Sequence, residues 1–443
     1  MVGVLTLANI SAFVDRQILG LLVAPIRRDL AITDTQMGVL YGMAFAAFYT
    51  LLGLPIARLA DRGSRRRIIA IGIAVWSVMT MLCGISRSYT ELLFARFGVG
   101  VGEAALAAPA ISMLADYFRR DRRATALSVY SLGIYLGAGL ANLVGGALIA
   151  RLSGAALVVW PVIGAVRSWQ QVFIAVGLPG LLVALLMWTV REPERREVRG
   201  SGGARGVHPP ASTSHPLRDV VAYIGDNRRT FLCHTSGYAL FALVNYGTAA
   251  WLPTMLIRTF GWSAGRAGIT LGALTATVGV LGIVVGGRTA DAMLARGYQD
   301  AKLRVGIVAA VANVACGVAY TLAPSPALAV AALVPYNFFA SFAFGAASAA
   351  LQEITPNRMR AQATALYFSV VNVVGLGLGP SVVALLTDRL FHDDSAVRYS
   401  LLVVTVIGLL AAAALLLAGL APFRRSVAYR AAWRGELTAT ETR

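Results

Sequence analysis

Charged side chains are scarce in this sequence of 443 residues. Only 14% are Asp, Glu, Lys or Arg, compared with about 25% in an ordinary soluble domain. Hydrophobic residues make up 57%, and the mean hydropathy is +0.69. This composition excludes an ordinary soluble protein and is typical of a membrane protein. At roughly 20 to 25 residues for each membrane-crossing helix plus the connectors between them, the chain has room for about a dozen such helices.

Cysteine and histidine are also rare. The three cysteines, Cys83, Cys233 and Cys316, lie inside apolar stretches, where a small buried side chain explains them without a disulfide or a metal. None of the four histidines has metal-ligand spacing. The sequence also has no evident nucleophile-and-base pattern and no phosphate-binding loop. We therefore expect no metal, no cofactor and no enzymatic activity.

Lysine occurs once, against 38 arginines, and the formal net charge is +18. Of the 39 basic residues, 28 lie in the even-numbered connectors between apolar stretches and in the C-terminal tail, and nine lie in the odd-numbered connectors. Basic residues are enriched in cytoplasmic connectors, so both termini are expected to be cytoplasmic. The same bias explains the positive charge without nucleic acid. The excess of Arg over Lys favours a GC-rich bacterium, and hence a bacterial inner membrane.

Twelve apolar stretches are predicted to span the membrane. They lie near residues 3–26, 37–57, 68–86, 90–114, 124–150, 169–190, 231–257, 267–287, 303–322, 327–351, 362–386 and 398–421. The first begins at Val2 without a basic leader and is not predicted to be a cleaved signal peptide, and its very short lead-in leaves open whether an N-terminal tail is missing. Residues 155–166 are apolar but too short to cross a bilayer, and we expect an interfacial loop there.

The two halves of the chain repeat in parallel. The segment Ala57–Asp61 recurs as Gly287–Asp291, and Ala124–Leu127 recurs as Ala363–Leu366, each at the matching connector. We therefore predict an all-α membrane protein with twelve transmembrane helices in two parallel six-helix pseudo-repeats. The expected units are residues 1–190, a linker over 191–229, residues 230–422 and a cytoplasmic tail over 423–443. Within the linker, Val220, Val221 and Ile224 have the spacing of a short amphipathic helix, with plain linker as the alternative.

Four charges interrupt the apolar stretches. Asp15 and Arg16 lie in the first span, and Arg96 and Glu103 in the fourth. A charge at the centre of a spanning helix costs roughly 2.5–3.5 kcal/mol and usually faces a cavity or an opposite charge. Arg96 and Glu103 are seven residues apart, on one helix face and about 10 Å apart along the axis. We predict that Arg16 and Arg96 bind substrate. The alternative is an ion-pair network that only holds the two helices together.

The matching positions of the second half carry no charge. Polar and aromatic residues there could form the opposite wall of a substrate site, and we predict this role for Asn245, Tyr246, Tyr336, Asn337 and Phe342. Ordinary packing is the alternative for each of them. Burial favours the neutral form of Asp15 and Glu103, whereas the neighbouring guanidinium groups favour their charged form. These two carboxylates are therefore the predicted proton-coupling residues.

A charged cluster, Asp61–Arg67, follows the second span. Its carboxylate could cap a helix or pair with the other half in one conformation only. We predict gating roles for Asp61, Arg62 and Arg65, and for Asp291 in the repeated motif. The alternative is that the cluster only orients the chain in the membrane.

Twelve spans, parallel halves and the Ala57–Arg67 cluster resemble the major facilitator superfamily, although Ala57 and Ser64 replace glycines that are usual in its signature. Within this superfamily, the sequence resembles the spinster family at three places: Asn9–Arg16, Arg96–Ala104 and Arg191-Glu192-Pro193. The resemblance implies transport of lysolipid-like molecules, such as lysophospholipids or sphingosine phosphates. It also implies that Asp15, Arg16, Arg96 and Glu103 handle head group and protons.

We therefore expect a monomeric secondary transporter that works by alternating access and couples a lipid-like substrate to protons. Its other partner is the lipid bilayer. A proton-coupled carrier of a small organic anion or a drug is the alternative within transport. A membrane receptor that does not transport is the alternative from another class.

Overall fold

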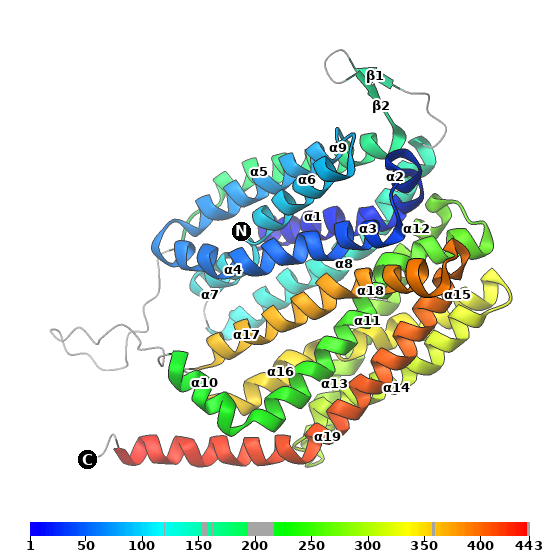
Figure 1. Ribbon diagram of the computed structural model, residues 1–443. Coiled ribbons are helices and arrows are strands. Elements are labelled where there is room, and N and C mark those ends of the chain that lie inside the picture. The colour runs from blue at the N-terminus through cyan, green and yellow to red at the C-terminus, as the bar shows by residue number, and fades with distance from the viewer. Residues whose placement is uncertain (119, 153–157, 161–163, 194–216, 357–358, 441–443) are drawn as a thin grey trace.

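In a computed structural model the chain is almost entirely helical (Figure 1). The structure describes residues 1–118, 120–152, 158–160, 164–193, 217–356 and 359–440. Twelve of the described helices are long and apolar enough to cross a membrane. They coincide with the twelve predicted spans to within a few residues at most ends, so the predicted fold class is confirmed.

The first six spans are formed by successive helices. They are α1 (Val2–Leu21), followed by the short α2 (Val23–Leu30); α3 (Asp34–Gly38), η1 (Val39–Met43) and α4 (Ala44–Arg62); α5 (Arg65–Cys83); α6 (Tyr89–Glu103) and α7 (Ala107–Tyr117); α8 (Arg120–Leu152); and α9 (Ser168–Thr189).

The second six spans follow the short helix α10 (Leu217–Asp226). They are α11 (Arg228–Phe260); α12 (Ala264–Leu274), η2 (Thr275–Gly279) and α13 (Val280–Ala295); α14 (Ala301–Leu322); α15 (Pro326–Phe342) and α16 (Phe344–Ile354); α17 (Arg360–Val371), η3 (Asn372–Leu378), α18 (Gly379–Leu385) and η4 (Leu386–Phe391); and η5 (Asp394–Ala396) with α19 (Val397–Thr440).

Polar residues at the connectors fix where several helices begin. The Ser64 and Ser88 side chains accept hydrogen bonds from backbone N–H groups in the first turns of α5 and α6. Thr33 and Gln36 form a reciprocal capping box at the start of α3. Gly261 ends α11 at φ +66°, a left-handed conformation that favours glycine. The connectors are therefore specified by local sequence as well as by polarity.

Two expectations change in detail. The predicted first span, 3–26, breaks at Leu22 into α1 and α2. Within residues 155–166, the described parts form a two-stranded antiparallel hairpin of β1 (Val158–Trp160) and β2 (Gly164–Val166) in place of a plain loop. The predicted amphipathic helix exists as α10, with Val220 buried and Val221 exposed. The linker residues 194–216 lie outside the described parts of the chain.

We call the end of the bundle that holds Met1 and Gly63 the terminal end, and the opposite end, which holds Leu22 and Gly261, the far end. In Figure 1 the first six spans lie above the second six, and both termini lie at one end. Contacts between the two sets run from the middle of the bundle to the far end and include α1 with α11, α8 with α12, α3 with α18 and η1 with η3.

Glycine makes part of this approach possible. A Cβ added to Gly42 in η1 would lie 2.5 Å from the carbonyl oxygen of Gly377 in η3, which is closer than a real Cβ can come. Two π-helical turns, η1 and η3, therefore meet with almost no side chain between them. These turns hold the two sets of spans together beside the buried charges of the first set.

Candidate functional site

The structure brings the buried charges of α1 and α6 together. Arg16 Nε donates a hydrogen bond to Glu103 Oε2 at 2.6 Å. The Glu103 side chain is fully buried, and the Arg16 side chain is 13% exposed. Asp15 and Arg96 are each 1% exposed. All four predicted charges thus lie in the interior of the first six spans, with an ion pair between the two helices.

Alternating glycines in α6 allow neighbouring helices to close around these charges. A Cβ on Gly100 would lie 2.6 Å from the Phe45 carbonyl oxygen, and one on Gly102 would lie 2.6 Å from the Trp76 backbone nitrogen. Glycine at these positions lets α4 and α5 approach α6 at backbone distance. Arg96 and Glu103 therefore sit in a dry environment, where a charge interacts strongly with any opposite charge.

Arg96 is a buried cation without a salt bridge in the described parts of the chain. Its Nε donates to the backbone carbonyl oxygen of Leu40 at 3.3 Å. The Phe45 ring lies beside both guanidinium groups, with its centroid 5.9 Å from Arg96 Cζ and 4.5 Å from Arg16 Cζ. The Tyr49 ring also lies over Arg16, at 5.0 Å. Two cations around one aromatic ring form a site that can accept an anion.

Asp15 has an unusual environment for a buried carboxylate. Neither of its oxygens has a hydrogen-bond partner among the described residues, and Glu103 Oε1 also lacks one. The charges that act most strongly on Asp15 are those of Glu103 and Arg96. Most buried polar atoms in proteins are hydrogen-bonded, and an exception requires an explanation. Two carboxylates beside Arg96, which has no salt bridge among the described residues, are suited to exchange of a proton.

Of the five residues predicted on the opposite wall, Tyr246 lies near Arg16 and packs against the core of the first half. The other four contact their own half. Asn245 Nδ2 donates to the Ala340 carbonyl oxygen, Tyr336 to Thr248 Oγ1, and Asn337 to the Leu333 carbonyl oxygen, while Phe342 packs against Phe338 and Phe339. In this conformation those four side chains help to build the interior of the second half.

Sequence reasoning missed the aromatic residues of the second span. Tyr41, Phe45 and Tyr49 are four residues apart and share one helix face. Phe45 and Tyr49 stack at 5.3 Å, and Tyr41 donates to Gln17 Oε1 in α1 at 2.6 Å. This spacing could have predicted, from the sequence alone, an aromatic face of the second span beside Arg16.

The predicted gating residues at the terminal end do not act together here. Arg65 is buried, and its Nη1 pairs with Asp116 Oδ2 at 2.5 Å and its Nε with Glu192 Oε1 at 3.0 Å, so neither partner comes from the second six spans. Arg62 and Asp291 are exposed. Asp61 lies in α4, but its side chain falls outside the described residues. These contacts tie α5 to α7 and to the segment after α9.

Glu192 completes the contacts of Arg65. Its carboxylate accepts from the Arg66 backbone N–H and from Ser64 Oγ, both at 2.8 Å, and from Arg65 Nε. Partial burial alone would raise its pKa, but these hydrogen bonds outweigh burial, and the pKa of Glu192 lies below its ordinary value. Glu192 is therefore held ionised at the start of α5.

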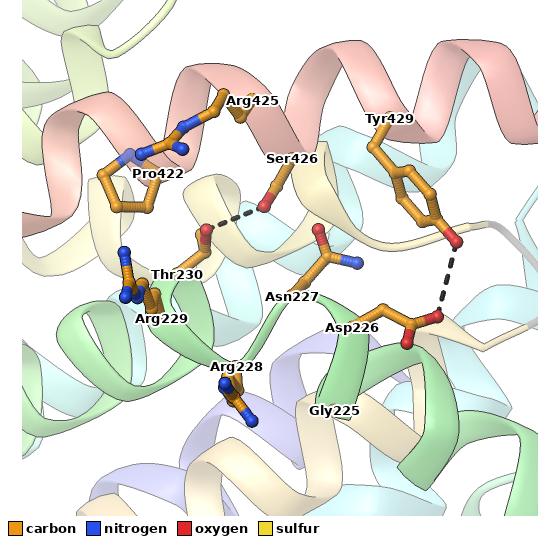
Figure 2. A pocket seen from close by; sticks show the side chains of 10 residues that line it. All are labelled: Gly225, Asp226, Asn227, Arg228, Arg229, Thr230, Pro422, Arg425, Ser426 and Tyr429. Atoms are coloured by element: carbon orange, nitrogen blue, oxygen red, sulfur yellow. Dashed lines mark hydrogen bonds between the residues drawn. The ribbon is translucent and has the colours of Figure 1, made fainter.

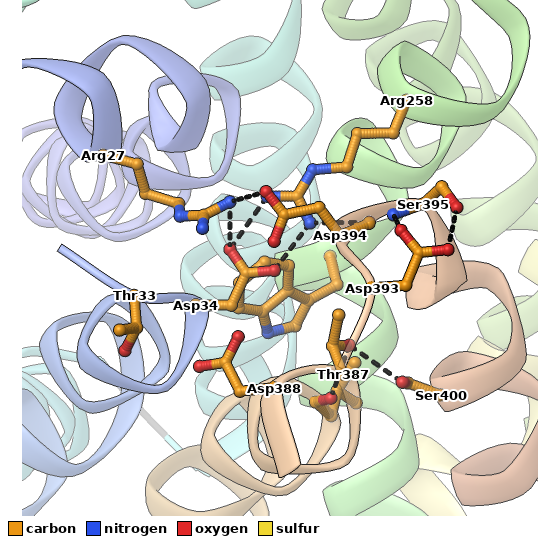
Figure 3. Close-up of polar contacts among 12 residues, drawn as sticks. Arg27, Thr33, Asp34, Arg258, Thr387, Asp388, Asp393, Asp394, Ser395 and Ser400 are labelled. Carbon is orange, nitrogen blue, oxygen red and sulfur yellow. Dashed lines mark hydrogen bonds and ion pairs between the residues drawn. The ribbon is translucent and has the colours of Figure 1, made fainter. Parts of the chain in front are cut away.

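A second charge cluster lies at the far end and was not predicted. We define the far-end ion cluster as Arg27, Asp34, Arg258 and Asp394 (Figure 3). Arg258 binds the fully buried Asp34 carboxylate through two hydrogen bonds, Nη1 to Oδ2 at 2.6 Å and Nη2 to Oδ1 at 2.8 Å. Arg27 Nη1 pairs with Asp394 Oδ2 at 2.6 Å and with Asp34 Oδ1 at 3.1 Å.

The far-end ion cluster joins the first six spans to the second six by charge. Burial would lower the pKa of Arg27, but its hydrogen bond to Asp394 and the nearby carboxylates raise it above its ordinary value. Asp388 lies close enough to Asp34 and Asp394 for the three to share a cation. However, it accepts from the Thr35 backbone N–H and Oγ1, both at 2.6 Å. These carboxylates thus have partners within the protein.

Comparisons with known proteins agree with this architecture. A sequence profile of the Major Facilitator Superfamily matches residues 5–380. An MFS-type efflux pump of Mycolicibacterium smegmatis is 31% identical over 409 residues, which cover 89% of this chain and 86% of that protein. A sphingosine-1-phosphate transporter of Danio rerio is 28% identical over 302 residues, which cover 65% of this chain and 55% of that protein. The match thus spans about half of the length of that relative.

A solved structure is similar over nearly its full length. It is described as a bacterial homolog to the human lysosomal transporter Spinster in an inward-facing and unoccupied conformation. It superposes on this chain with a TM-score of 0.81 and 29% identity, and the match covers 96% of this chain and 97% of that one.

Proposed function

Because this chain belongs to the major facilitator superfamily and is a membrane transporter, not an enzyme, we propose a specific transport function for it. It is a proton-coupled carrier of a lysolipid-like amphiphile. Its working cycle is alternating access, in which residues 1–190 and 230–422 rock against each other and residues 191–229 connect them. The protein acts as a monomer in a bacterial inner membrane, with both termini in the cytoplasm.

Arg96 is the observation that carries this proposal. A buried guanidinium whose described hydrogen bond goes to a backbone carbonyl is an incomplete site, because guanidinium binds carboxylate and phosphate through two parallel hydrogen bonds. A phosphate or carboxylate head group would complete it. Arg16, which also lies beside the Phe45 ring, would join this head group by leaving Glu103.

Asp15 and Glu103 are the proposed proton carriers. Asp15 is buried without a hydrogen-bond partner among the described residues, and an ionised carboxylate in that position costs several kcal/mol. If Arg16 leaves Glu103 to bind a head group, the Glu103 carboxylate also loses its partner, as Asp15 already lacks one. Proton uptake would then accompany substrate binding, and proton loss would accompany release.

The arrangement of the two halves supports alternating access. They contact each other from the middle of the bundle to the far end, where the far-end ion cluster links them. The similar bacterial structure is described as inward-facing. We propose that the far end is extracytoplasmic and closed in this conformation, and that opening it requires separation of Asp34 from Arg258. Asp61, Arg62, Arg65 and Asp291 would act at the opposite, cytoplasmic end.

The second half supplies the apolar side of the proposed site. Tyr246 lies near Arg16 in this conformation. Asn245, Tyr336, Asn337 and Phe342 would line the path of the acyl chain after the halves move. Similarity to the sphingosine-1-phosphate transporter of Danio rerio supports a lysolipid as the substrate of this chain. Similarity to the efflux pump of Mycolicibacterium smegmatis supports the alternative, a drug or a small organic anion.

Uptake into sealed liposomes tests this proposal. The purified protein is reconstituted, and uptake of a radiolabelled lysophospholipid and of small organic anions is measured with and without an imposed pH gradient. Wild-type protein should accumulate the lysolipid only with the gradient. The Arg96→Gln variant should lose uptake, and Asp15→Asn and Glu103→Gln should lose its pH dependence. Wild-type rates with unchanged pH dependence in both carboxylate variants would rule out the proton mechanism, and binding without flux would indicate a receptor.

A further inference from the structure

A basic recess lies at the terminal end, away from the buried charges. It has a volume of about 620 Å³ and lies where the corner between α10 and α11 faces the last part of α19 (Figure 2). A hydrogen bond of 2.7 Å between the hydroxyl groups of Thr230 and Ser426, which are both buried, joins α11 to α19 beside it. The recess is therefore a fixed feature of the second six spans.

Three arginines border the recess: Arg228, Arg229 and Arg425. None of them forms a salt bridge with a described residue. In Figure 2, Arg229 and Arg425 extend to the side of the recess near Pro422, whereas Asp226 and Tyr429, which share a hydrogen bond of 3.4 Å, lie on the opposite side. Positive charge thus collects on one side, away from the carboxylate.

The start of α11 adds hydrogen-bond donors to the same place. Asn227 precedes this helix of 33 residues, and its side chain makes no capping hydrogen bond. The Thr230 N–H donates to the Asn227 carbonyl oxygen, and the two N–H groups before it, of Arg228 and Arg229, lack acceptors within the helix and favour an anion. Together with the arginines, they give the recess the donor set of a phosphate site.

Exposed apolar residues place the recess at the depth of lipid head groups. Leu232 lies one turn after Arg228 on the same face of α11 and is 63% exposed. On α19, Leu417 is 52% exposed, about two turns before Arg425. Exposed leucines on a membrane helix face lipid tails, and arginines just beyond them lie at the membrane surface. Both α11 and α19 pass from exposed leucines to arginines beside the recess.

We propose that this recess binds the phosphate of an anionic membrane phospholipid, with Arg229 and Arg425 as its main contacts. The chemistry is that of basic sites between transmembrane helices that hold acidic head groups. This lipid is distinct from the transported substrate, because the recess lies in the second six spans and the buried charges lie in the first. The inference rests on the membrane-spanning fold and stands apart from the proposed substrate.

Native mass spectrometry of the purified full chain tests the proposal. The protein is titrated with phosphatidylglycerol, and with phosphatidylcholine as the uncharged comparison. Each arginine near a membrane surface contributes roughly five-fold to the affinity for an acidic lipid. The double variant Arg229→Gln/Arg425→Gln should therefore bind the tightest phosphatidylglycerol about 30-fold more weakly. A double Arg-to-Lys variant should keep most of the affinity.

The matched control is Arg288→Gln/Arg296→Gln, which removes two exposed arginines from the second six spans without touching the recess. Its lipid affinity should equal that of the wild type. An equal loss in both Gln pairs, or no loss in the recess pair, would overturn the proposal, as would displacement of the lipid by millimolar inorganic phosphate. If the recess pair is not monodisperse, the single variants R229Q and R425Q carry the test, with about five-fold expected for each.

Discussion

Neutralising Asp34 should open the far end of the transporter. The Asp34→Asn change keeps the shape of the side chain but removes the charge that Arg258 and Arg27 share. Asp34 is fully buried and accepts two hydrogen bonds from one guanidinium group. Loss of one partner of a buried ion pair costs about 3 kcal/mol or more, because Arg258 is left without its carboxylate, whereas Arg27 keeps Asp394.

That cost falls on one conformation only. Asp34 lies in the first six spans and Arg258 in the second, so their contact exists only while the far end is closed. A penalty of about 3 kcal/mol on that state shifts its equilibrium with a far-end-open state on the order of a hundredfold. The variant should therefore populate far-end-open molecules that the wild type scarcely forms.

Double electron–electron resonance measures this shift directly. Nitroxide labels are placed at the exposed far-end residues Arg28 and Arg389, in a background that lacks the three native cysteines. The wild type should give one short distance, and Asp34→Asn should add a longer one. The matched control is Asp29→Asn, because Asp29 contacts Arg167 and Trp169 within the same half. If the Asp34 and Asp29 variants gave the same distances as the wild type, the reasoning would be refuted.

Two further predictions concern contacts elsewhere in the bundle. Because the pKa of Glu192 is lowered in the folded protein, its contribution to stability is present above the unfolded pKa and is lost as pH falls through the folded pKa. The melting temperature of Glu192→Gln should therefore be below that of the wild type at pH 7, and the gap should narrow as pH approaches 4. Gly42→Ala should force η1 away from η3, where its Cβ would lie 2.5 Å from the Gly377 carbonyl oxygen, and should lengthen the same far-end distances. Gly53→Ala, with open space at its Cβ, should leave them unchanged.

The spans and the buried charges could be predicted from sequence because both signals are local. A stretch of about 20 apolar residues is long enough to cross a bilayer whatever its surroundings. A charge such as Glu103 stands out within such a stretch because of its cost. The capping residues Ser64 and Ser88 were equally local signals, although their side-chain bonds were seen only in the structure.

The far-end ion cluster could not be predicted in this way. Asp34 and Arg258 are separated by 224 positions, and each lies near a connector, where charged residues are common and carry no signal of their partner. The same limit applies to Arg65 and Glu192, which are 127 positions apart. Pairing between connectors depends on how the helices pack, and the π-helical turns that set this packing, η1 and η3, do not differ from α-helix in their apolar pattern.

The second span links the anion site to the far-end ion cluster. Asp34 begins this span, and Leu40 follows six residues later, about 9 Å along the helix axis. The Leu40 carbonyl oxygen, which accepts the hydrogen bond from Arg96, belongs to the π-helical turn η1, where Gly42 faces η3. In the proposed mechanism, a head group that binds Arg96 would compete with this carbonyl and so would act on the turn that holds the two halves together. Because Asp34 lies on the same span, we expect the change at η1 to reach the ion pair with Arg258 without any charge moving between the halves.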